Sequence, residues 1–268
     1  MKRNIYSHVF KISVVLFLMT TVFFSCEKEK PNVKSANNVR LDILHIYDNY
    51  NEMSDLALNK LNSNDIANEL NPYDYVGQLH NEVLDFVFCE TKNEFCDLLD
   101  KAVIYYNSSS EINCDNIMRL CSYGVVKSFN DKGEFNSIIF EELLKEKKIS
   151  KNEYDLISTT ISLSVKLEAS ERIKFIKEIE KYIVGSSVLT SCEKERNLMA
   201  FSIYRYSTFY WNENILVSSV WEPVITAVDA IARHWALTSE DSFAQDGKDV
   251  HLFAGLMSAS VRIIFILH

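Results

Sequence analysis

The chain has 268 residues with 37 acidic and 28 basic side chains, so its formal net charge is −9. This acidic excess argues against nucleic acid and against an anionic lipid surface as partners. Six Gly and three Pro supply too little turn chemistry for a many-stranded β-fold, whereas the hydrophobic content of 47% is sufficient for a packed core.

Residues 1–25 have the layout of a secretory signal peptide. Three basic residues and no acid precede an apolar run over 12–24, which is shorter than the ~20 residues that span a bilayer as a helix. Ser25 followed by Cys26 resembles the lipobox of bacterial lipoproteins, in which the cysteine is diacylated and becomes the first residue of the mature chain. The alternative is an ordinary signal peptide that is cut near Ser25.

The lipidated interpretation predicts a tether and an address. Residues 26–38 are polar, contain Pro31 and lack apolar periodicity, as expected of a solvated linker. Because Glu27 rather than Asp follows the cysteine, the signal for inner-membrane retention is absent, and we expect a lipid-anchored protein of the cell envelope at the outer membrane. Removal of residues 1–25 takes away three basic residues and no acid, so the formal charge falls to −12.

Helical periodicity dominates from residue 39 onwards, so we expect an all-α fold, an irregular multi-helix bundle behind the signal peptide and the flexible tether. The predicted helices span 38–62, 71–89, 90–106, 113–129, 134–148, 151–166, 169–184 and 191–211. The first of them has Leu41 and Leu44 on its apolar face. Capping boxes are expected where Ser150 precedes Glu153 and where Thr190 precedes Glu193.

We expect one helical domain over 39–212 and a C-terminal helical segment over 213–268, either separate or part of the same domain. The final run over 252–267 is hydrophobic and is interrupted by Arg262. A buried last helix is the expected reading, because the run is short for a membrane span. The alternative is a membrane-seeking or partner-binding helix.

Residues 71–81 read NPYDYVGQLHN. This stretch resembles an NPYDxxGxxHN opening of uncharacterised Bacteroidota-type envelope lipoproteins. A second block of that family, roughly LTxxEKxxL before an aromatic-Trp end, is similar to residues 189–198 and 210–211. The resemblance covers 70–212 and links neither motif to chemistry. Members of that family often end in a Gly/Ala-rich tail; since residues 225–268 contain only two Gly, we do not carry membrane insertion over to this chain.

Tyr73, Gly77 and His80 share one face of the predicted helix. A glycine inside a helix costs about 1 kcal/mol relative to alanine, so Gly77 indicates close approach of a ligand or of another helix. One hypothesis is a small ligand pocket around these three residues, and the other is a helix–helix contact with a core histidine. The aromatic residues Tyr204 and Trp211 pose the same choice between a glycan-binding platform and the core.

Cysteine spacing suggests a stapled hairpin. Cys89 and Cys96 are seven residues apart, as are Cys114 and Cys121, so each pair lies on one face of its helix. Antiparallel helices would then join Cys89 to Cys121 and Cys96 to Cys114, which leaves Cys192 unpaired. Buried free thiols are the alternative.

We find no motif for a metal ion, a cofactor or catalysis. The six histidines are well separated, and neither a Gly-rich phosphate loop nor a GxSxG motif occurs. The sequence therefore favours a lipid-anchored envelope protein that is not an enzyme and acts through protein–protein interaction. The alternative is a glycan- or small-ligand-binding lipoprotein beside an uptake system, and a hydrolase assembled from distant residues is the weakest hypothesis.

Overall fold

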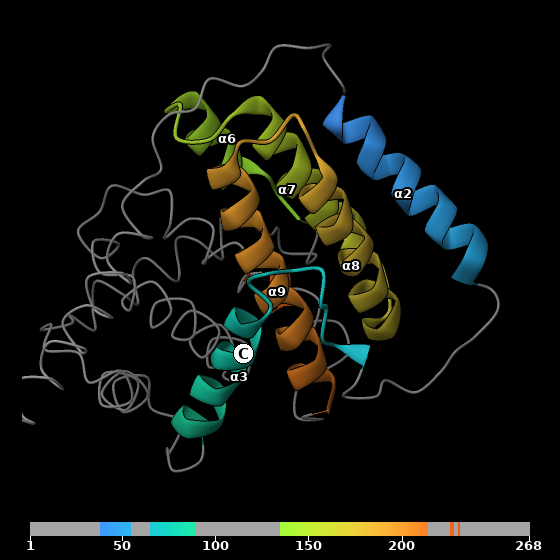
Figure 1. The fold of residues 1–268 in the computed structure, drawn as a ribbon, viewed down its shortest axis with the longest axis vertical. Coiled ribbons are helices and arrows are strands. Elements are labelled where there is room, and N and C mark those ends of the chain that lie inside the picture. Colours follow the sequence, from blue (N-terminus) through green and yellow to red (C-terminus); the bar gives the residue numbers. More distant parts are fainter. Residues whose placement is uncertain (1–37, 55–64, 89–134, 214–225, 228–229, 231–268) are drawn as a thin grey trace, which may run out of the picture.

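The computed structural model describes residues 38–54, 65–88, 135–213, 226, 227 and 230 (Figure 1). This part is 76% helical with six helices, which confirms the all-α fold class. The helices are α2 (Val39–Ser54), α3 (Tyr75–Phe88), α6 (Ile138–Lys145), α7 (Lys151–Ser164), α8 (Ala169–Gly185) and α9 (Ser191–Glu213). The predicted signal peptide, most of the tether, the helices over 90–106 and 113–129, and nearly all of 213–268 lie outside the described residues.

α8 lies between three other helices of the bundle. It packs against α9, α7 and α2, while α3 packs on α9 and α6 packs on α7. Along the longest axis of the molecule, α6 and the start of α2 lie at the upper end and α3 lies at the lower end (Figure 1). The two ends therefore present different helices.

Isoleucines of α8 form the centre of the core. Fully buried isoleucines recur every three or four residues along this helix, at Ile173, Ile176, Ile179 and Ile183. This spacing is that of one helical face. On another part of α8, the ring of Phe175 meets Tyr47 of α2 edge-on, with 5.5 Å between the ring centroids. Burial of both surfaces fixes α8 between its neighbours.

The predicted apolar face of α2 is correct in part: Leu44 is half-buried, but Leu41 lies outside the core. Val39 and Ile43 are buried, whereas Leu41 is 59% exposed, so the expectation that Leu41 faces the core is wrong. The hydroxyl of Tyr182 in α8 donates to Asp42 Oδ2 at 2.9 Å. Val39 and Ile43 therefore lie on the buried side of α2.

Of the two predicted capping boxes, the one at Thr190 forms both of its hydrogen bonds and the one at Ser150 forms only one. Thr190 Oγ1 accepts from the Glu193 amide at 3.3 Å, and Glu193 Oε2 accepts from the Thr190 amide at 2.8 Å, which completes a capping box. Ser150 Oγ accepts from the Glu153 amide at 3.2 Å. The Glu153 carboxylate instead binds Arg196, because it points into the interior.

α3 begins at Tyr75, four residues later than the predicted start at Asn71. Asn71 Oδ1 accepts from the Tyr73 amide at 2.9 Å, so the asparagine side chain closes a local turn instead of capping the helix. The Asp74 amide donates to the Asn71 carbonyl at 3.1 Å. The segment 65–74 is thus a structured loop that delivers the chain into α3.

Candidate functional site

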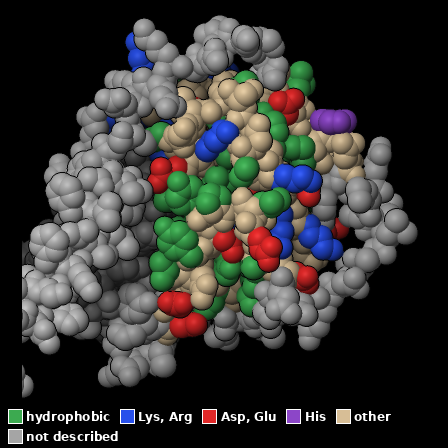
Figure 2. Space-filling view, viewed as in Figure 1, with side chains coloured by type: hydrophobic (Ala, Val, Ile, Leu, Met, Phe, Trp, Pro, Cys, Tyr) green, Lys and Arg blue, Asp and Glu red, His purple; other side chains and the backbone are tan. Residues whose placement is uncertain are grey.

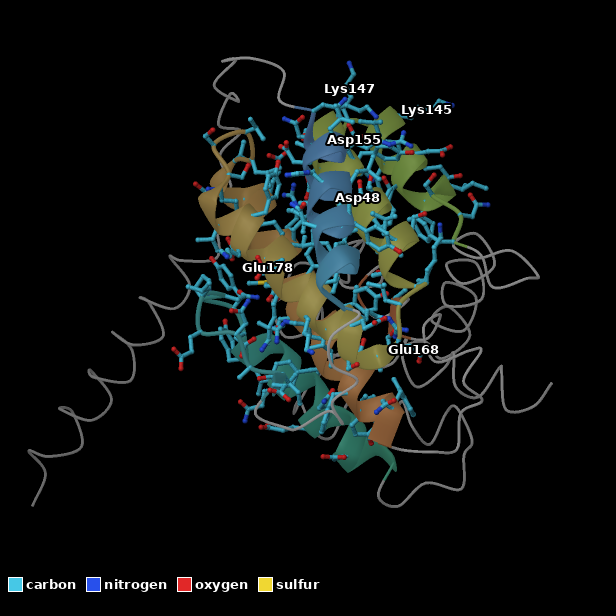
Figure 3. All side chains as sticks on the ribbon, turned by 90° about the vertical axis from the view of Figure 1, so that its right-hand side faces the viewer. Asp48, Lys145, Lys147, Asp155, Glu168 and Glu178 are labelled. Atoms are coloured by element: carbon cyan, nitrogen blue, oxygen red, sulfur yellow. The ribbon has the colours of Figure 1, made fainter. Side chains whose placement is uncertain are left out.

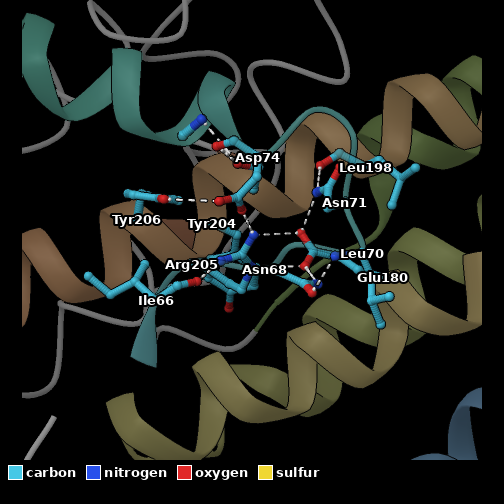
Figure 4. Close-up of polar contacts among 12 residues, drawn as sticks. Ile66, Asn68, Leu70, Asn71, Asp74, Glu180, Leu198, Tyr204, Arg205 and Tyr206 are labelled. Atoms are coloured by element: carbon cyan, nitrogen blue, oxygen red, sulfur yellow. Dashed lines mark hydrogen bonds and ion pairs between the residues drawn. The ribbon is translucent and has the colours of Figure 1, made fainter. Parts of the chain in front are cut away.

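A buried polar cluster joins the 65–74 loop to α8 and α9 (Figure 4). We call it the Arg205 cluster; it comprises Asn68, Asn71, Asp74, Glu180, Arg205 and Tyr206. The guanidinium of Arg205 is fully buried, and its Nε lies 2.9 Å from Glu180 Oε2. Its two terminal nitrogens bind Asp74 and the carbonyl oxygen of Ile66. One arginine of α9 thereby holds both a helix and a loop.

The two asparagines of the loop also bind Glu180, in addition to Arg205. Asn68 Nδ2 donates to Oε2 at 2.6 Å, and Asn71 Nδ2 donates to Oε1 at 2.8 Å. Asn71 Nδ2 also donates to the Leu198 carbonyl at 2.9 Å. Both oxygens of the Glu180 carboxylate therefore accept from donors of the protein, as a buried charge requires.

Electrostatics of the cluster are dominated by burial. Desolvation raises the pKa of the Glu180 carboxyl, and the Arg205 charge and the two amide donors oppose that rise. Burial, together with the Asp74 charge, raises the pKa of Tyr206 to about 12; its hydroxyl donates to Asp74 Oδ2 at 3.1 Å. Burial and the neighbouring Arg205 charge lower the pKa of Lys177.

The NPYDYVGQLHN stretch acts as a clasp between α3 and the rest of the bundle. Besides Asn71 and Asp74, its last residue, Asn81, donates from Nδ2 to the Tyr206 carbonyl at 2.9 Å. Half-buried Tyr73 packs against the core cluster that Val76 of α3 forms with Met199 and Ile203 of α9. Asn71, Asp74 and Asn81 of the motif are therefore used in internal contacts.

Gly77 marks a point of close approach between α3 and α9. Its amide donates to Ser202 Oγ at 3.0 Å, and this hydroxyl donates to the Asp74 carbonyl at 2.8 Å. A Cβ at position 77 would lie 2.6 Å from the Ser202 carbonyl oxygen and would also meet the Tyr206 ring. The space beside Gly77 is filled by α9, which agrees with the helix-contact hypothesis.

The other predicted ligand residues are also interior. His80 is 4% exposed, and its Nδ1 lies 3.1 Å from Asn81 Oδ1. Tyr204 is fully buried, with its hydroxyl 2.9 Å from Ser164 Oγ, and Trp211 is 2% exposed. The ring faces of Tyr204 and Trp211 are consequently not available for stacking on a sugar.

These residues also do not converge on one site. Gly77 faces Ser202 and Tyr206 of α9, whereas the Tyr204 hydroxyl points to Ser164 at the end of α7. The structure brings together Tyr73, Gly77 and the Arg205 cluster, and it places Tyr204 in a separate contact.

A second buried ion pair ties α7 to α9. Glu153 is fully buried, and Arg196 binds it with two nitrogens, Nε at 3.0 Å and Nη2 at 2.6 Å. Asn197 Nδ2 adds a third donor at 3.1 Å. Arg196 Nη1 also lies 2.9 Å from the sulfur of Cys192.

Cys192 is disulfide-bonded, so the expectation that it is unpaired is wrong. The predicted pairs Cys89–Cys121 and Cys96–Cys114 lie outside the described residues. In the described part of the chain, no three His, Cys, Asp or Glu side chains gather as a metal ion would require. None of the described helices combines the length and the apolar character needed to cross a membrane.

α3 also has side chains that point to solvent rather than towards α9. Among the side chains of α3 that the structure describes, five exposed ones lie on the outer side of the helix: Tyr75, Gln78, Leu79, Glu82 and Asp85. We call them the outer face of α3. Tyr75 is 51% exposed and Leu79 is 36% exposed. Hydrophobic side chains with acidic ones around them are visible where α3 and α9 lie (Figure 2).

Comparison with known proteins adds no functional assignment. No family model, curated protein or solved structure matches this chain.

Proposed function

We propose that this chain is a lipid-anchored protein of the cell envelope, attached through Cys26, and that it acts by binding another protein through the outer face of α3. The anchor follows from the N-terminal sequence. The binding role rests on one structural observation: the inner side of α3 is fixed to α9, while its outer side exposes Tyr75 and Leu79.

The contrast between the two sides of α3 supports a binding surface. On the inner side, Val76 and Leu84 are fully buried and Gly77 is pressed against Ser202. A helix held this firmly presents its outer side chains in a fixed arrangement, which lowers the entropy cost of binding. Tyrosine is one of the residue types that most often anchor a protein interface, so Tyr75 is the expected anchor of this surface.

The buried charged residues also support a binding role, because they are poorly placed for catalysis. The charged residues at the centre of the molecule, Glu180, Arg205 and Glu153, are fully buried and bound to other protein groups. Groups that are already paired and shielded from solvent hold helices together and are poorly suited to chemistry on a substrate. Binding through an exposed surface is therefore the function that these residues favour.

A photo-crosslinking amino acid placed at position 79 of the full chain, expressed in its native envelope, tests the proposal. We expect a crosslinked product of discrete mass that disappears when Tyr75→Ser is added. The matched control places the same amino acid at position 48, an exposed position on α2 (Figure 3), where we expect no such product. Equal products at both positions, or none at position 79, would contradict the binding role.

A further inference from the structure

The segment that carries the outer face of α3 is strongly acidic. Residues 65–88 contain five carboxylates and neither Lys nor Arg. Asp74 is the one among them that binds Arg205 inside the bundle. Glu69, Glu82 and Asp85 are exposed. The charge that this segment presents to solvent is therefore negative along its whole length.

The apolar and acidic residues occupy successive parts of one helical face. Tyr75 and Leu79 are one turn apart at the beginning of α3, and Glu82 and Asp85 follow on the next two turns. Ten residues of helix span about 15 Å, which is the length of a short contact with a partner helix or strand. The order along α3 is thus an apolar half followed by an acidic half.

The acidic half is unfavourable for the helix by itself. Asp85 lies in the last turn of α3, where the helix dipole disfavours negative charge, and that turn contains no basic residue. Glu82 lies three residues before it, so the two carboxylates repel one another. Within the described part of the chain, the contact of Glu82 is a long hydrogen bond of 3.4 Å from Gln78 Nε2, and Asp85 has no ion-pair partner. A cation from outside the helix would relieve both costs.

We propose that the partner of the outer face of α3 is a cationic protein surface with apolar side chains between its Lys or Arg residues. Tyr75 and Leu79 receive the apolar side chains, and Glu82 and Asp85 pair with the positive charges. This inference rests on the proposed function and adds the chemistry of the partner. A second copy of the same face does not fit, because its carboxylates would repel these two.

Two model peptides test this chemistry directly, whichever protein the partner is. One is a helical peptide of alternating Leu and Lys residues at amphipathic spacing, and the other has Glu at every Lys position. The chain from residue 26 onwards, with Cys26→Ala to remove only the lipid, is titrated with each fluorescent peptide. We expect saturable binding of the cationic peptide, weakened at least tenfold between low salt and 0.5 M salt, and no binding of the acidic peptide.

Matched charge variants locate the binding site. Glu82→Gln combined with Asp85→Asn removes two exposed carboxylates from α3 and is expected to weaken binding of the cationic peptide at least fivefold. The control removes one Asp and one Glu elsewhere, Asp48→Asn in α2 and Glu178→Gln in α8; both are exposed (Figure 3), and neither helix packs on α3. Equal loss in both double variants would overturn the inference, because the peptide would then sense only total charge.

The outcomes separate this inference from the proposed function. If crosslinking at position 79 succeeds but the α3 charge variant leaves the native product unchanged, the binding role stands and the cationic partner is wrong. If the purified chain dimerises in a manner that depends on Tyr75 and Leu79, the occupant of the face is a second copy and the inference is wrong. If position 79 gives no product, the proposed function fails first.

Discussion

The guanidinium of Arg205 and the carboxylate of Glu180 lie 2.9 Å apart, from Nε to Oε2, and neither side chain is exposed to solvent. They come from α9 and α8, and each also binds the 65–74 loop, Arg205 through Asp74 and Glu180 through Asn71. The pair is therefore the point at which three segments of the chain meet.

Removal of one partner of this ion pair is expected to destabilise the folded protein strongly. Arg205→Met leaves the Glu180 carboxylate buried without its counter-charge, which should lower the free energy of unfolding by about 3–5 kcal/mol. The double variant Arg205→Met with Glu180→Met leaves neither charge, so its loss should be well below the sum of the two single losses. Denaturant unfolding of the four proteins measures the coupling. Strictly additive losses would show that the pair does not act as a unit.

Gly77→Ala should destabilise the protein although alanine favours helices. The new Cβ would lie 2.6 Å from the Ser202 carbonyl oxygen, so α3 and α9 must separate, and overpacking of this kind costs about 1–3 kcal/mol. Gly185 at the end of α8 is the control, because a Cβ there has no atom within 4 Å. Gly185→Ala should be neutral or slightly stabilising. A thermal unfolding midpoint lowered equally in both variants would argue against the close helix approach.

Lys147 is the residue at which we expect a stabilising substitution. It follows α6 with φ 60, and the Lys147 and Lys148 amides donate to the carbonyls of Leu144 and Leu143, which is the Schellman arrangement that glycine favours. Lys147→Gly removes the left-handed strain and should raise the free energy of unfolding by about 1 kcal/mol. Lys147→Ala retains the strain and serves as the control. A gain in the alanine variant as large as in the glycine variant would contradict the assignment.

Tyr206 should make the protein sensitive to alkaline pH. Burial and the Asp74 charge raise the pKa of Tyr206 from 10.0 to about 12. The unfolded chain loses this proton first, so the stability that the protonated hydroxyl contributes is complete below pH 10 and disappears as pH rises from 10 towards 12. In Tyr206→Phe, the free energy of unfolding should fall less steeply over that interval.

Unfolding of both proteins at pH 8 supplies the reference for this comparison. The loss of the hydrogen bond to Asp74 appears there as a constant offset between the two curves. Parallel curves from pH 8 to 11.5 would show that Tyr206 ionises in the folded protein as it does in the unfolded chain.

Periodicity is a good guide to the helices of this chain and a poor guide to its interior. The helices predicted over 151–166, 169–184 and 191–211 agree with α7, α8 and α9 within two residues. Side-chain caps at Ser150 and Thr190 fix the starts of α7 and α9, and a regular stripe of isoleucines defines α8. The predicted helix start at Asn71 is wrong, since the side chain of Asn71 binds both a local turn and a carboxylate more than 100 residues away. No local pattern contains that second contact.

The Arg205 cluster leaves one signal in the sequence, which is a charged residue inside an apolar helical stripe. Glu180 lies four residues after Ile176 and three residues before Ile183, within the apolar stripe of α8. A charged residue in a buried stripe requires a partner of opposite charge, so the stripe predicts that such a partner exists. Its identity as Arg205 depends on how α8 and α9 pack, which spacing does not reveal.

The prediction for Leu41 is wrong for a related reason. Val39 and Ile43 alternate with Leu41 along α2, and several apolar faces can be drawn through such a helix. The face that packs is chosen by the surface that α7 and α8 offer, which is a property of the assembled bundle.

The proposed role depends most on the anchor, because a protein without it need not meet a partner at the envelope. Mass spectrometry of the N-terminal peptide of the protein purified from its native membrane tests the anchor directly. We predict that the mature chain begins at Cys26 and that this residue carries the mass of a diacylglyceryl group. A mature chain that begins elsewhere, or a Cys26 found in a disulfide with Cys192, would contradict the proposal.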